Sequence, residues 1–490
     1  MQDIFDEIVG FVKLDQSEDE VFQHPLLTRL GGIKQLGLAC MTFPGANHTR
    51  LSHSLGTLHY AGEIADALIE SKTGNLNDPD TFRQTTRMAG LLHDIGHTPL
   101  SHTLEHHLVA IYKREANASV VEGGTKGPLL SHPVIKEVNK VLGPNRNPFD
   151  NSVLSSLLVA RSSISDKLTK RDFSPEDIAK IISGQMRPEY YSQILDAGLD
   201  ADKIDYLQRD KHGTGVPYAS FDVGQIIKFM KIEDDRIIID GAAANACLHF
   251  LLIRYFWYAQ VILNRNVHAF EEMATRIYDS LASIGLLPTP TEILGRLKDI
   301  VDRKSGAENW WAEFDDRAFL SAMVEAKHLD GKSRDGDPPS PLSSKDLLTF
   351  ISKVENRTAL PCAVRIDAVE IPYEKNGEVA YVNQNPGWKN YEKFVEWLRQ
   401  EKKEEIAKGH IIVSPPREIS VTKPKEKENP ILIMTKHDKE PKTLQEHYYT
   451  RIIAGDFPEL PLKFTANRVF CIDGLLEDLD AIWQKFAKES

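Results

Sequence analysis

Residues 88–102 read MAGLLHDIGHTPLSH, an apolar helical turn that runs into an adjacent histidine and aspartate. Neighbouring residues on a helix point about 100° apart, so His93 and Asp94 cannot both face solvent while Leu91, Leu92 and Ile95 face a core. An imidazole and a carboxylate beside a core are costly unless something pairs with them. A metal ion is the simplest single partner for both. A buried His-Asp hydrogen bond is the alternative.

The composition of the 490-residue chain is that of a globular protein with two or more domains. Its four cysteines are scattered without CxxC spacing, which argues against a cysteine zinc site and a disulfide framework. This cysteine usage suggests a reducing compartment, and we expect a cytoplasmic location. The formal net charge of −12 argues against stable nucleic-acid binding, which needs a basic surface.

Hydrophobic patterning predicts no membrane segment, because no run of about 18 apolar residues occurs. The acidic N-terminus, MQDIFDE, does not resemble a signal peptide. We divide the chain into an N-terminal segment over residues 1–24, a helical domain over 25–360 and a smaller α/β lobe over 361–490.

Apolar periodicity predicts helices over residues 24–36, 51–70 and 80–95, with Gly96 and Pro99 ending the last of them. Residues 113–131 contain three glycines and little periodicity, which predicts a flexible loop.

Short β-branched runs in the C-terminal lobe predict strands. They lie at residues 364–366, 411–413, 431–434 and 468–472. Between them, residues 388–408 read as a charged helix.

Three segments supply His53, His93 with Asp94, and Asp202. Two imidazoles and two carboxylates suit Mn²⁺, Fe²⁺, Mg²⁺ or Zn²⁺, with positions left open for water and substrate. The residues lie on different segments, so spacing alone does not show that they meet. Each sits at the edge of an expected helix, beside small or turn residues.

The order His53, His93-Asp94, Asp202 is similar to that of HD-domain phosphohydrolases. The surrounding words resemble the deoxynucleoside triphosphate (dNTP) triphosphohydrolase branch, the group that contains the sterile-alpha-motif/HD-domain protein. They are IKQLG, FPGANHTRLSHSLG, AGLLHDIGHTPLSHTLEH and DADKIDYLQRD. The resemblance runs from about Asp6 to about Ala274 and returns weakly further on. It implies a mainly α fold, with a helical HD phosphohydrolase core and a smaller C-terminal α/β lobe.

The resemblance also implies an activity, in which water attacks the α-phosphorus of a dNTP and triphosphate is released from the deoxynucleoside. It implies one divalent ion held by His53, His93, Asp94 and Asp202, and further Mg²⁺ can accompany the nucleotide. His102 matches the catalytic histidine, Glu105 its orienting carboxylate, and His97 a phosphate-contacting histidine. Arg50, Lys203 and Arg254 match cationic positions on the triphosphate. Gln35, Leu36, Tyr206 and Asp210 match positions around the sugar, and Tyr258 matches a base-side position.

The sequence departs from the family pattern at two places. A further family histidine is normally followed by Glu, whereas the best match here, His132, is followed by Pro133. Gln23, Thr28 and Gly31 stand where the family has a guanine effector pocket. We therefore expect a homo-oligomer, dimer or tetramer, that GTP does not activate and whose effector, if it has one, is a dNTP.

Two alternatives stay open at this stage. One is another phosphohydrolase on the same scaffold, cleaving nucleoside monophosphates or single-stranded nucleic acid. The acidic balance and the set Arg50, Lys203 and Arg254 favour a triphosphate instead. The other is a module that binds dNTPs without hydrolysing them, against which the metal set and His102 argue.

Overall fold

The computed structural model describes residues 2–488, with the exceptions given next. These are residues 75, 77, 122–126, 219, 331–340, 376–377, 384–387, 421–429, 436–437, 439, 445–446 and 448–462. The chain forms two compact units, which interleave along the sequence. The first comprises Met1–Leu248, Pro288–Ser321 and Lys427–Leu444, and the second comprises His249–Leu287, Ala322–Glu426 and Gln445–Ser490. The domains predicted from the sequence, residues 1–24, 25–360 and 361–490, stay predictions.

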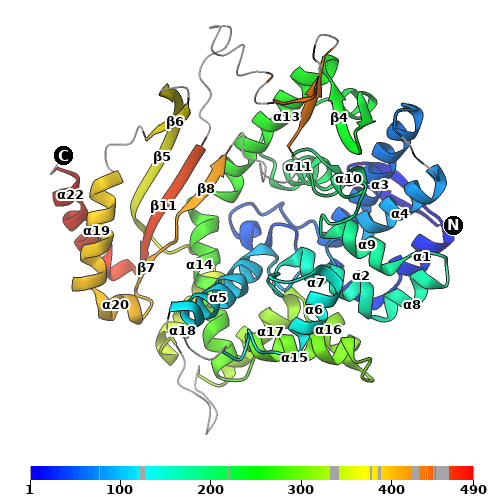
Figure 1. Cartoon of the computed structure of the whole chain (residues 1–490). Helices are drawn as coiled ribbons and strands as arrows, with labels where there is room; N and C mark the ends of the chain where they lie inside the picture. The colour runs from blue at the N-terminus through cyan, green and yellow to red at the C-terminus, as the bar shows by residue number, and fades with distance from the viewer. Residues whose placement is uncertain are drawn as a thin grey trace. The chain divides into compact units, whose positions relative to one another are not determined.

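Three helices make the centre of the first unit: α3 (Arg50–Glu70), α4 (Pro79–Leu92) and α11 (Ala201–Thr214) (Figure 1). Each begins at a side chain that accepts a backbone N–H of the first turn: Thr49, Asp78 and Asp200. α3 and α4 approach closely at Gly90, where a Cβ would lie 3.0 Å from the carbonyl oxygen of Thr57. This packing brings the ends of three helices to one place.

The remaining helices of the first unit surround this centre. They are α1 (Gln16–Phe22), α2 (Pro25–Thr28), η1 (Arg29–Gly32), η2 (Gly37–Met41), α5 (His102–Val121), α6 (Val134–Leu142), α7 (Asn151–Arg161), α8 (Ser163–Thr169), α9 (Pro175–Ile182), α10 (Glu189–Gln193), α12 (Val223–Lys228), η3 (Gly241–Ala243), α15 (Pro290–Val301), α16 (Ala307–Glu313) and the start of α17 (Asp316–His328).

Two small sheets complete the first unit. β1 (Gln2–Asp6) and β2 (Gly10–Leu14) form an antiparallel hairpin in which Phe5 faces Phe11. The other sheet has the order β10-β9-β4-β3. Its strands are β3 (Met230–Glu233), β4 (Arg236–Asp240), β9 (Leu432–Met434) and β10 (Lys442–Thr443).

The second unit combines helices with an antiparallel sheet of order β6-β5-β11-β7, in which β8 also pairs with β11. The strands are β5 (Cys362–Lys375), β6 (Glu378–Asn383), β7 (Ile411–Val413), β8 (Arg417–Ser420) and β11 (Lys463–Cys471). The helices are α13 (Ala244–Trp257), which begins in the first unit, a π-helix (Tyr258–Ile262), α14 (Arg265–Ser283), α18 (Ser344–Glu355), α19 (Trp388–Glu401), α20 (Lys403–Ala407), η5 (Asp473–Leu475) and α22 (Leu476–Ala487).

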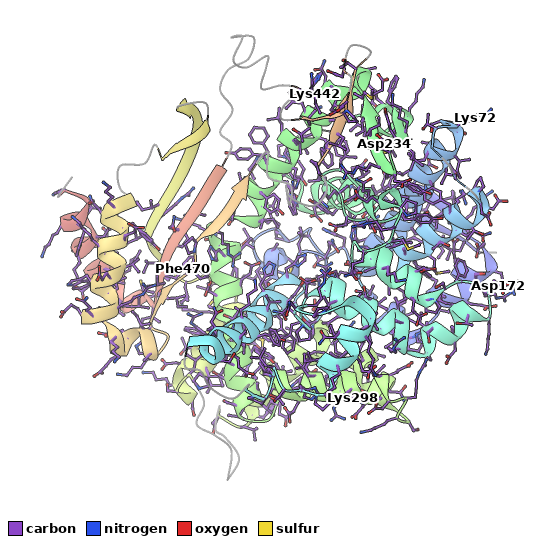
Figure 2. All side chains as sticks on the ribbon, in the orientation of Figure 1. Lys72, Asp172, Asp234, Lys298, Lys442 and Phe470 are labelled. Carbon is purple, nitrogen blue, oxygen red and sulfur yellow. The ribbon has the colours of Figure 1, made fainter. Side chains whose placement is uncertain are left out.

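Burial of aromatic and aliphatic side chains joins α19 and α22 to this sheet, and Figure 1 shows the two helices together beside it. Phe394 of α19 and Val469 of β11 are fully buried in the shared core. Phe470, also on β11 and labelled in Figure 2, packs its ring edge-on against the ring of His268 on α14. The apolar area removed from water stabilises this half of the unit.

The mainly α fold expected from the sequence is confirmed. The strands expected at residues 364–366, 411–413 and 468–472 are present within β5, β7 and β11. The strand expected at residues 431–434 also forms, but it pairs with β4 in the first unit rather than joining the C-terminal sheet. The charged helix over residues 388–408 is divided at Lys402 into α19 and α20.

Three local expectations were wrong. Residues 24–36 do not form one helix, because Gly31 and Gly32 favour a short 3₁₀ turn, although the apolar residues Leu26, Leu27 and Leu30 are buried as the pattern predicts. The helix α4 ends at Leu92, so that His93 caps it and Asp94 lies just beyond.

Residues 113–121, expected to be a loop, continue the helix α5. Glu115 on that helix accepts the backbone N–H groups of Leu129 and Leu130 as the chain returns. These hydrogen bonds favour a longer helix than local composition indicates. Residues 122–126 of the expected loop lie outside the described part of the chain.

Within the described residues, no single helix is long and apolar enough to cross a membrane. One bent pair passes the length and composition criteria together, Gly241–Ile262 with Arg265–Ser283, which meet at 60°.

Candidate metal centre and active site

The four predicted metal ligands converge in the first unit. The Nε2 atom of His53, on α3, lies 3.2 Å from Nε2 of His93 and 3.0 Å from Oδ1 of Asp202 on α11. Oδ1 of Asp94 lies 3.3 Å from Nε2 of His93. His53, His93 and Asp94 each offer a ligand atom within 4.8 Å of the others, a group suited to a divalent ion.

Hydrogen bonds on the far side of each ring determine which nitrogen faces this group. Nδ1 of His93 lies 2.8 Å from the carbonyl oxygen of Gly90, which can only accept, so Nδ1 carries the hydrogen. Nδ1 of His53 lies 2.7 Å from Oδ2 of Asp205, which makes it a donor as well. The two Nε2 atoms are therefore the ring nitrogens that face one another and the carboxylates, and this set of atoms fits a cation.

The pKa values of His53 and Asp202 also indicate that the site favours a positive charge. Burial opposes ionisation of His53, but the hydrogen bonds that the ring donates to Asp202 and Asp205 outweigh it and raise the pKa of the ring to about 10. Burial would also raise the pKa of Asp202, yet its hydrogen bond with His53 and the neighbouring positive charges hold that pKa well below the usual range. The site thus keeps its carboxylates ionised and attracts a cation.

Asp94 is held by three further residues. Arg50 donates to its Oδ2 over 2.5 Å, Asn151 donates to its Oδ1 over 3.1 Å, and Nε2 of His97 lies 3.3 Å from the same oxygen. Burial alone would raise the pKa of Asp94, but the positive charge of Arg50 holds it well below its usual range. Arg50, itself 2% exposed, also donates to Ser101 Oγ over 2.7 Å. The positive charge of Arg50 is therefore part of the candidate metal centre.

A second group stands next to the first, at the start of α5. Nδ1 of His102 lies 2.8 Å from Oε2 of Glu105, and Nδ1 of His97 lies 3.4 Å from the same oxygen. Oε1 of Glu105 accepts the backbone N–H of Asn151 over 2.9 Å. Burial would raise the pKa of Glu105, but His102 holds it well below its usual range. Burial, assisted by Arg50, lowers the pKa of His97 to about 3, so this ring is neutral.

Exposure separates the two histidines of this group. His102 is 59% exposed, whereas His97 is 1% exposed. A ring that is open to solvent and fixed by an ionised carboxylate can exchange protons with a bound substrate. His102 has that arrangement and His97 does not.

A family model described as "HD domain" matches residues 50–210, the span from Arg50 to Asp210 that holds both groups. The chain carries an HD domain. The helical phosphohydrolase fold inferred from the sequence is thereby confirmed for this part of the chain.

Proteins similar to this chain occur in bacteria, archaea and animals. The chain is 28% identical over 249 residues to the uncharacterized protein YwfO of Bacillus subtilis, covering 51% of this chain and 48% of YwfO. It is 30% identical over 241 residues to the human deoxynucleoside triphosphate triphosphohydrolase SAMHD1, covering 47% of this chain and 36% of SAMHD1. The chain spans about half the length, or less, of these two curated relatives.

Solved structures share the fold over a longer span. The crystal structure of a phosphohydrolase from Bacteroides thetaiotaomicron superposes with a TM-score of 0.63 at 22% identity. The alignment covers 95% of this chain and 99% of that one. At this level of identity the match shows the fold alone.

The helix α11 carries the predicted metal ligand Asp202 and the predicted substrate residues Lys203, Tyr206 and Asp210. Asp202, Tyr206 and Asp210 are spaced four residues apart, which places them on one face of the helix. Lys203, beside Asp202, donates to Asp200 over 2.6 Å. Asp210 accepts from His48 over 2.8 Å when Nε2 of that ring carries the hydrogen.

Gln35 and Leu36 lie in the turn before η2. The backbone N–H of Gln35 donates to the carbonyl of His48, and Leu36 is half-buried. Gly37 follows with a φ of +50°, and a Cβ there would lie 2.7 Å from the carbonyl oxygen of Leu100. Both conditions favour glycine, which brings this turn against the segment that begins α5.

Three further predicted residues come from other elements. His132 precedes α6, where its Nδ1 accepts the backbone N–H of Val134 over 3.3 Å. Arg254 and Tyr258 belong to the second unit, where the guanidinium carbon lies 5.5 Å from the centre of the tyrosine ring. Their functional roles stay predictions.

Two residues of the site were missed from the sequence. Asn151 binds both Asp94 and Glu105, and it stands at the first position of α7 with no motif around it. Asp205 binds His53, and the only signal was its acidity next to Asp202 on the same expected helix. A search for carboxylates one turn from a predicted ligand would have found Asp205 but not Asn151.

Proposed function

We propose that this protein hydrolyses dNTPs to a deoxynucleoside and triphosphate, with water attacking the α-phosphorus. One observation carries the proposal: the ligand atoms of His53, His93, Asp94 and Asp202 converge beside the exposed ring of His102 and its partner Glu105. The first group is suited to a cation and the second to proton transfer. Animal relatives named as dNTP triphosphohydrolases support the choice of substrate.

A divalent ion held by the first group would act as a Lewis acid on a phosphate oxygen and would lower the pKa of a bound water. The protein residues do the rest. Arg50 keeps Asp94 ionised and adds positive potential where a triphosphate would lie. The N-terminus of the 20-residue helix α5 adds to that potential, because helix N-termini favour anions.

Proton transfer falls to His102. The bond that breaks joins the α-phosphorus to the 5′ oxygen, which leaves poorly unless it gains a proton. Glu105 accepts from Nδ1 of His102 and is ionised, so it stabilises the protonated ring. The hydrogen on Nε2 of that ring then passes to the 5′ oxygen, and the deoxynucleoside leaves.

Sugar and base selection fall to residues around these groups. We propose that Gln35, Tyr206 and Asp210 contact the deoxyribose, and that Leu36 excludes a 2′-hydroxyl. Lys203 and Arg254 are proposed to bind the triphosphate and Tyr258 to lie on the base side. The protein is proposed to act as a homo-oligomer, dimer or tetramer.

Product analysis tests the proposal. The protein is incubated with each dNTP, singly and mixed, with Mn²⁺ or Mg²⁺, and the products are separated by ion-exchange chromatography. We expect deoxynucleoside and intact triphosphate in equal amounts. Pyrophosphate with a deoxynucleoside monophosphate, or orthophosphate alone, would place the attack at another phosphorus. The absence of any product from every dNTP would favour a binding module instead.

A further inference from the structure

His53 is oriented by a carboxylate from a neighbouring helix. Oδ2 of Asp205, on α11, lies 2.7 Å from Nδ1 of His53, and Asp205 is fully buried. Asp205 follows Asp202 by three residues, so one helix supplies both a ligand on the metal side of the His53 ring and a partner on its far side. The ring is thereby held from two sides.

Asp205 is in turn held by Arg209, one turn further along α11. Nε of Arg209 donates to Oδ2 of Asp205 and Nη2 donates to Oδ1, each over 2.8 Å. Both side chains have no exposed surface. A two-pronged charge-assisted pair fixes direction as well as distance. The orientation of Asp205 therefore depends on Arg209.

Arg209 also binds a residue of the N-terminal hairpin. Its Nη1 donates to Oδ2 of Asp6 over 2.8 Å and its Nη2 donates to Oδ1 over 3.0 Å. Asp6 ends β1, and its Oδ1 also accepts the backbone N–H groups of Ile8 and Val9 in the hairpin turn. We call Asp6, Arg209 and Asp205 the anchor chain.

The helix α3 leaves room for the anchor chain at Gly56, one turn after His53. A Cβ at this position would lie 1.8 Å from Oδ1 of Asp205 and 2.6 Å from Nη2 of Arg209. Any side chain here would displace the pair. The space at Gly56 is a second observation, independent of the hydrogen bonds, that the pair belongs against the helix that carries His53.

We propose that the anchor chain sets the affinity of the metal centre, so that Asp205 is a positioning residue for His53 and the N-terminal hairpin is its distant support. The inference rests on the metal site of the proposed function. His93 offers a contrast, because its Nδ1 donates to the backbone carbonyl of Gly90 and needs no side chain for its orientation. Partners behind a metal-ligating histidine commonly change metal affinity by about 10–100-fold.

The substitution Arg209→Lys tests the proposal. Lysine keeps the positive charge but has no fork with which to hold both carboxylates. Mn²⁺ binding to the full-length protein, without nucleotide, is measured by isothermal titration calorimetry. We expect affinity about 10-fold weaker than in the parent protein, the lower end of the range because Arg209 acts through Asp205.

A matched control is available in the same unit. Arg87 forms a comparable fork with Glu18, over 2.7 and 2.9 Å, and its side chain is 10% exposed. These residues are not among the ligands or the anchor chain. Arg87→Lys should lower the melting temperature by a similar amount and leave Mn²⁺ affinity within about two-fold of the parent. A merely structural role of Arg209 would make the two variants alike.

Two results would overturn the inference: Arg209→Lys binding Mn²⁺ as the parent does, or Arg87→Lys weakening it equally. A parent protein that binds no Mn²⁺ would overturn it too. If Arg209→Lys does not fold, Asp6→Asn is measured in its place, and at least about three-fold weaker binding is expected. Because nucleotide is absent, failure here is distinguishable from failure of the product analysis, which tests the proposed activity.

Discussion

Two helices of this protein each pair a histidine with a glutamate about one turn away. On α5, His102 binds Glu105, and on α14, Nε2 of His268 lies 3.6 Å from Oε1 of Glu272. The residue types and spacings are almost the same. Exposure is not, because His102 is 59% exposed and His268 is fully buried.

A serine forms hydrogen bonds with both residues of the α14 pair. Ser414 donates its hydroxyl to Glu272 over 2.7 Å and lies 2.5 Å from Nε2 of His268, so that it accepts from the ring. Burial lowers the pKa of His268 and keeps it neutral. The α14 group resembles a nucleophile with its base, yet its side chains are buried. The comparison teaches that residue type and spacing alone do not decide whether such a pair is open to solvent, as proton transfer to a substrate would require.

The largest loss of activity is expected from a substitution in the candidate metal centre, which lies next to the α5 pair. Asp94→Asn removes a negative charge from the ligand set while the amide keeps the shape of the side chain. We expect both bound metal and turnover to be lost, with the fold intact by circular dichroism. The variant Glu272→Gln, on the α14 side, should keep its metal. Elemental analysis that found stoichiometric metal in folded Asp94→Asn protein would contradict the ligand assignment.

The substitution His102→Ala tests the exposed ring of the α5 pair. We expect dNTP turnover to fall by about 10²–10⁴-fold, the usual worth of one acid–base group, while Mn²⁺ binding and melting temperature stay as in the parent. Single-turnover kinetics at saturating dNTP measures the chemical step. A variant that hydrolyses dNTPs at nearly the parent rate would move proton transfer to His97 or His132.

A substitution in the buried α14 pair should lower stability rather than turnover. Burial would raise the pKa of Glu272, but its hydrogen bond with His268 and the charge of Arg276 lower it to about 2. A lowered pKa contributes stability that is full above about pH 4.5 and is lost as pH falls towards 2. Glu272→Gln should therefore cost about 3 kcal/mol at pH 7, without changing turnover.

Urea unfolding at pH 7 and at pH 3 measures this effect. The parent should lose stability between the two pH values, and Glu272→Gln should lose less. Equal losses in both proteins would show that Glu272 is not the group responsible. A large fall in turnover would show that the α14 group takes part in the reaction.

Substrate selection should change more modestly. Leu36→Gly removes a half-buried side chain from the proposed sugar site, and we expect the preference for dNTP over the matching ribonucleotide to narrow by about 10-fold. Rates with dATP and ATP are compared in the parent and the variant. Leu36→Met, of similar size, should keep the preference. Equal hydrolysis of ATP and dATP by the parent protein would refute this role.

The smallest expected effect is that of GTP. Gln23 donates to Asp19 over 2.9 Å, Thr28 donates to the carbonyl of Pro25, and Gly31 has no side chain. A buried guanine would lose about 1–3 kcal/mol for each hydrogen bond not made. We expect GTP to change neither dNTP hydrolysis nor the sedimentation coefficient, whereas a dNTP can do both. Activation by GTP together with GTP-driven assembly would contradict this interpretation.

The sequence by itself determined the mainly α fold and the four residues that converge in the candidate metal centre. His93-Asp94 could be predicted because a helix that places leucines in a core must also bury the polar pair at its end. His53 and Asp202 followed from the resemblance, whose motifs are long enough to be specific. The burial of Leu26, Leu27 and Leu30 also followed from their pattern, although the helix drawn through them did not form.

Only the tertiary structure decided which polar residues act together. Asp202 and Asp205 look alike in the sequence, yet one faces the ligand group and the other supports His53 from behind. His102 and His268 also look alike in the sequence, yet one is exposed and the other is buried. Local periodicity shows which face of a helix is apolar, but not which helix will pack on it. The hydrogen bond between His53 and Asp205 spans 152 residues, and it exists because Gly56 lets α11 approach α3.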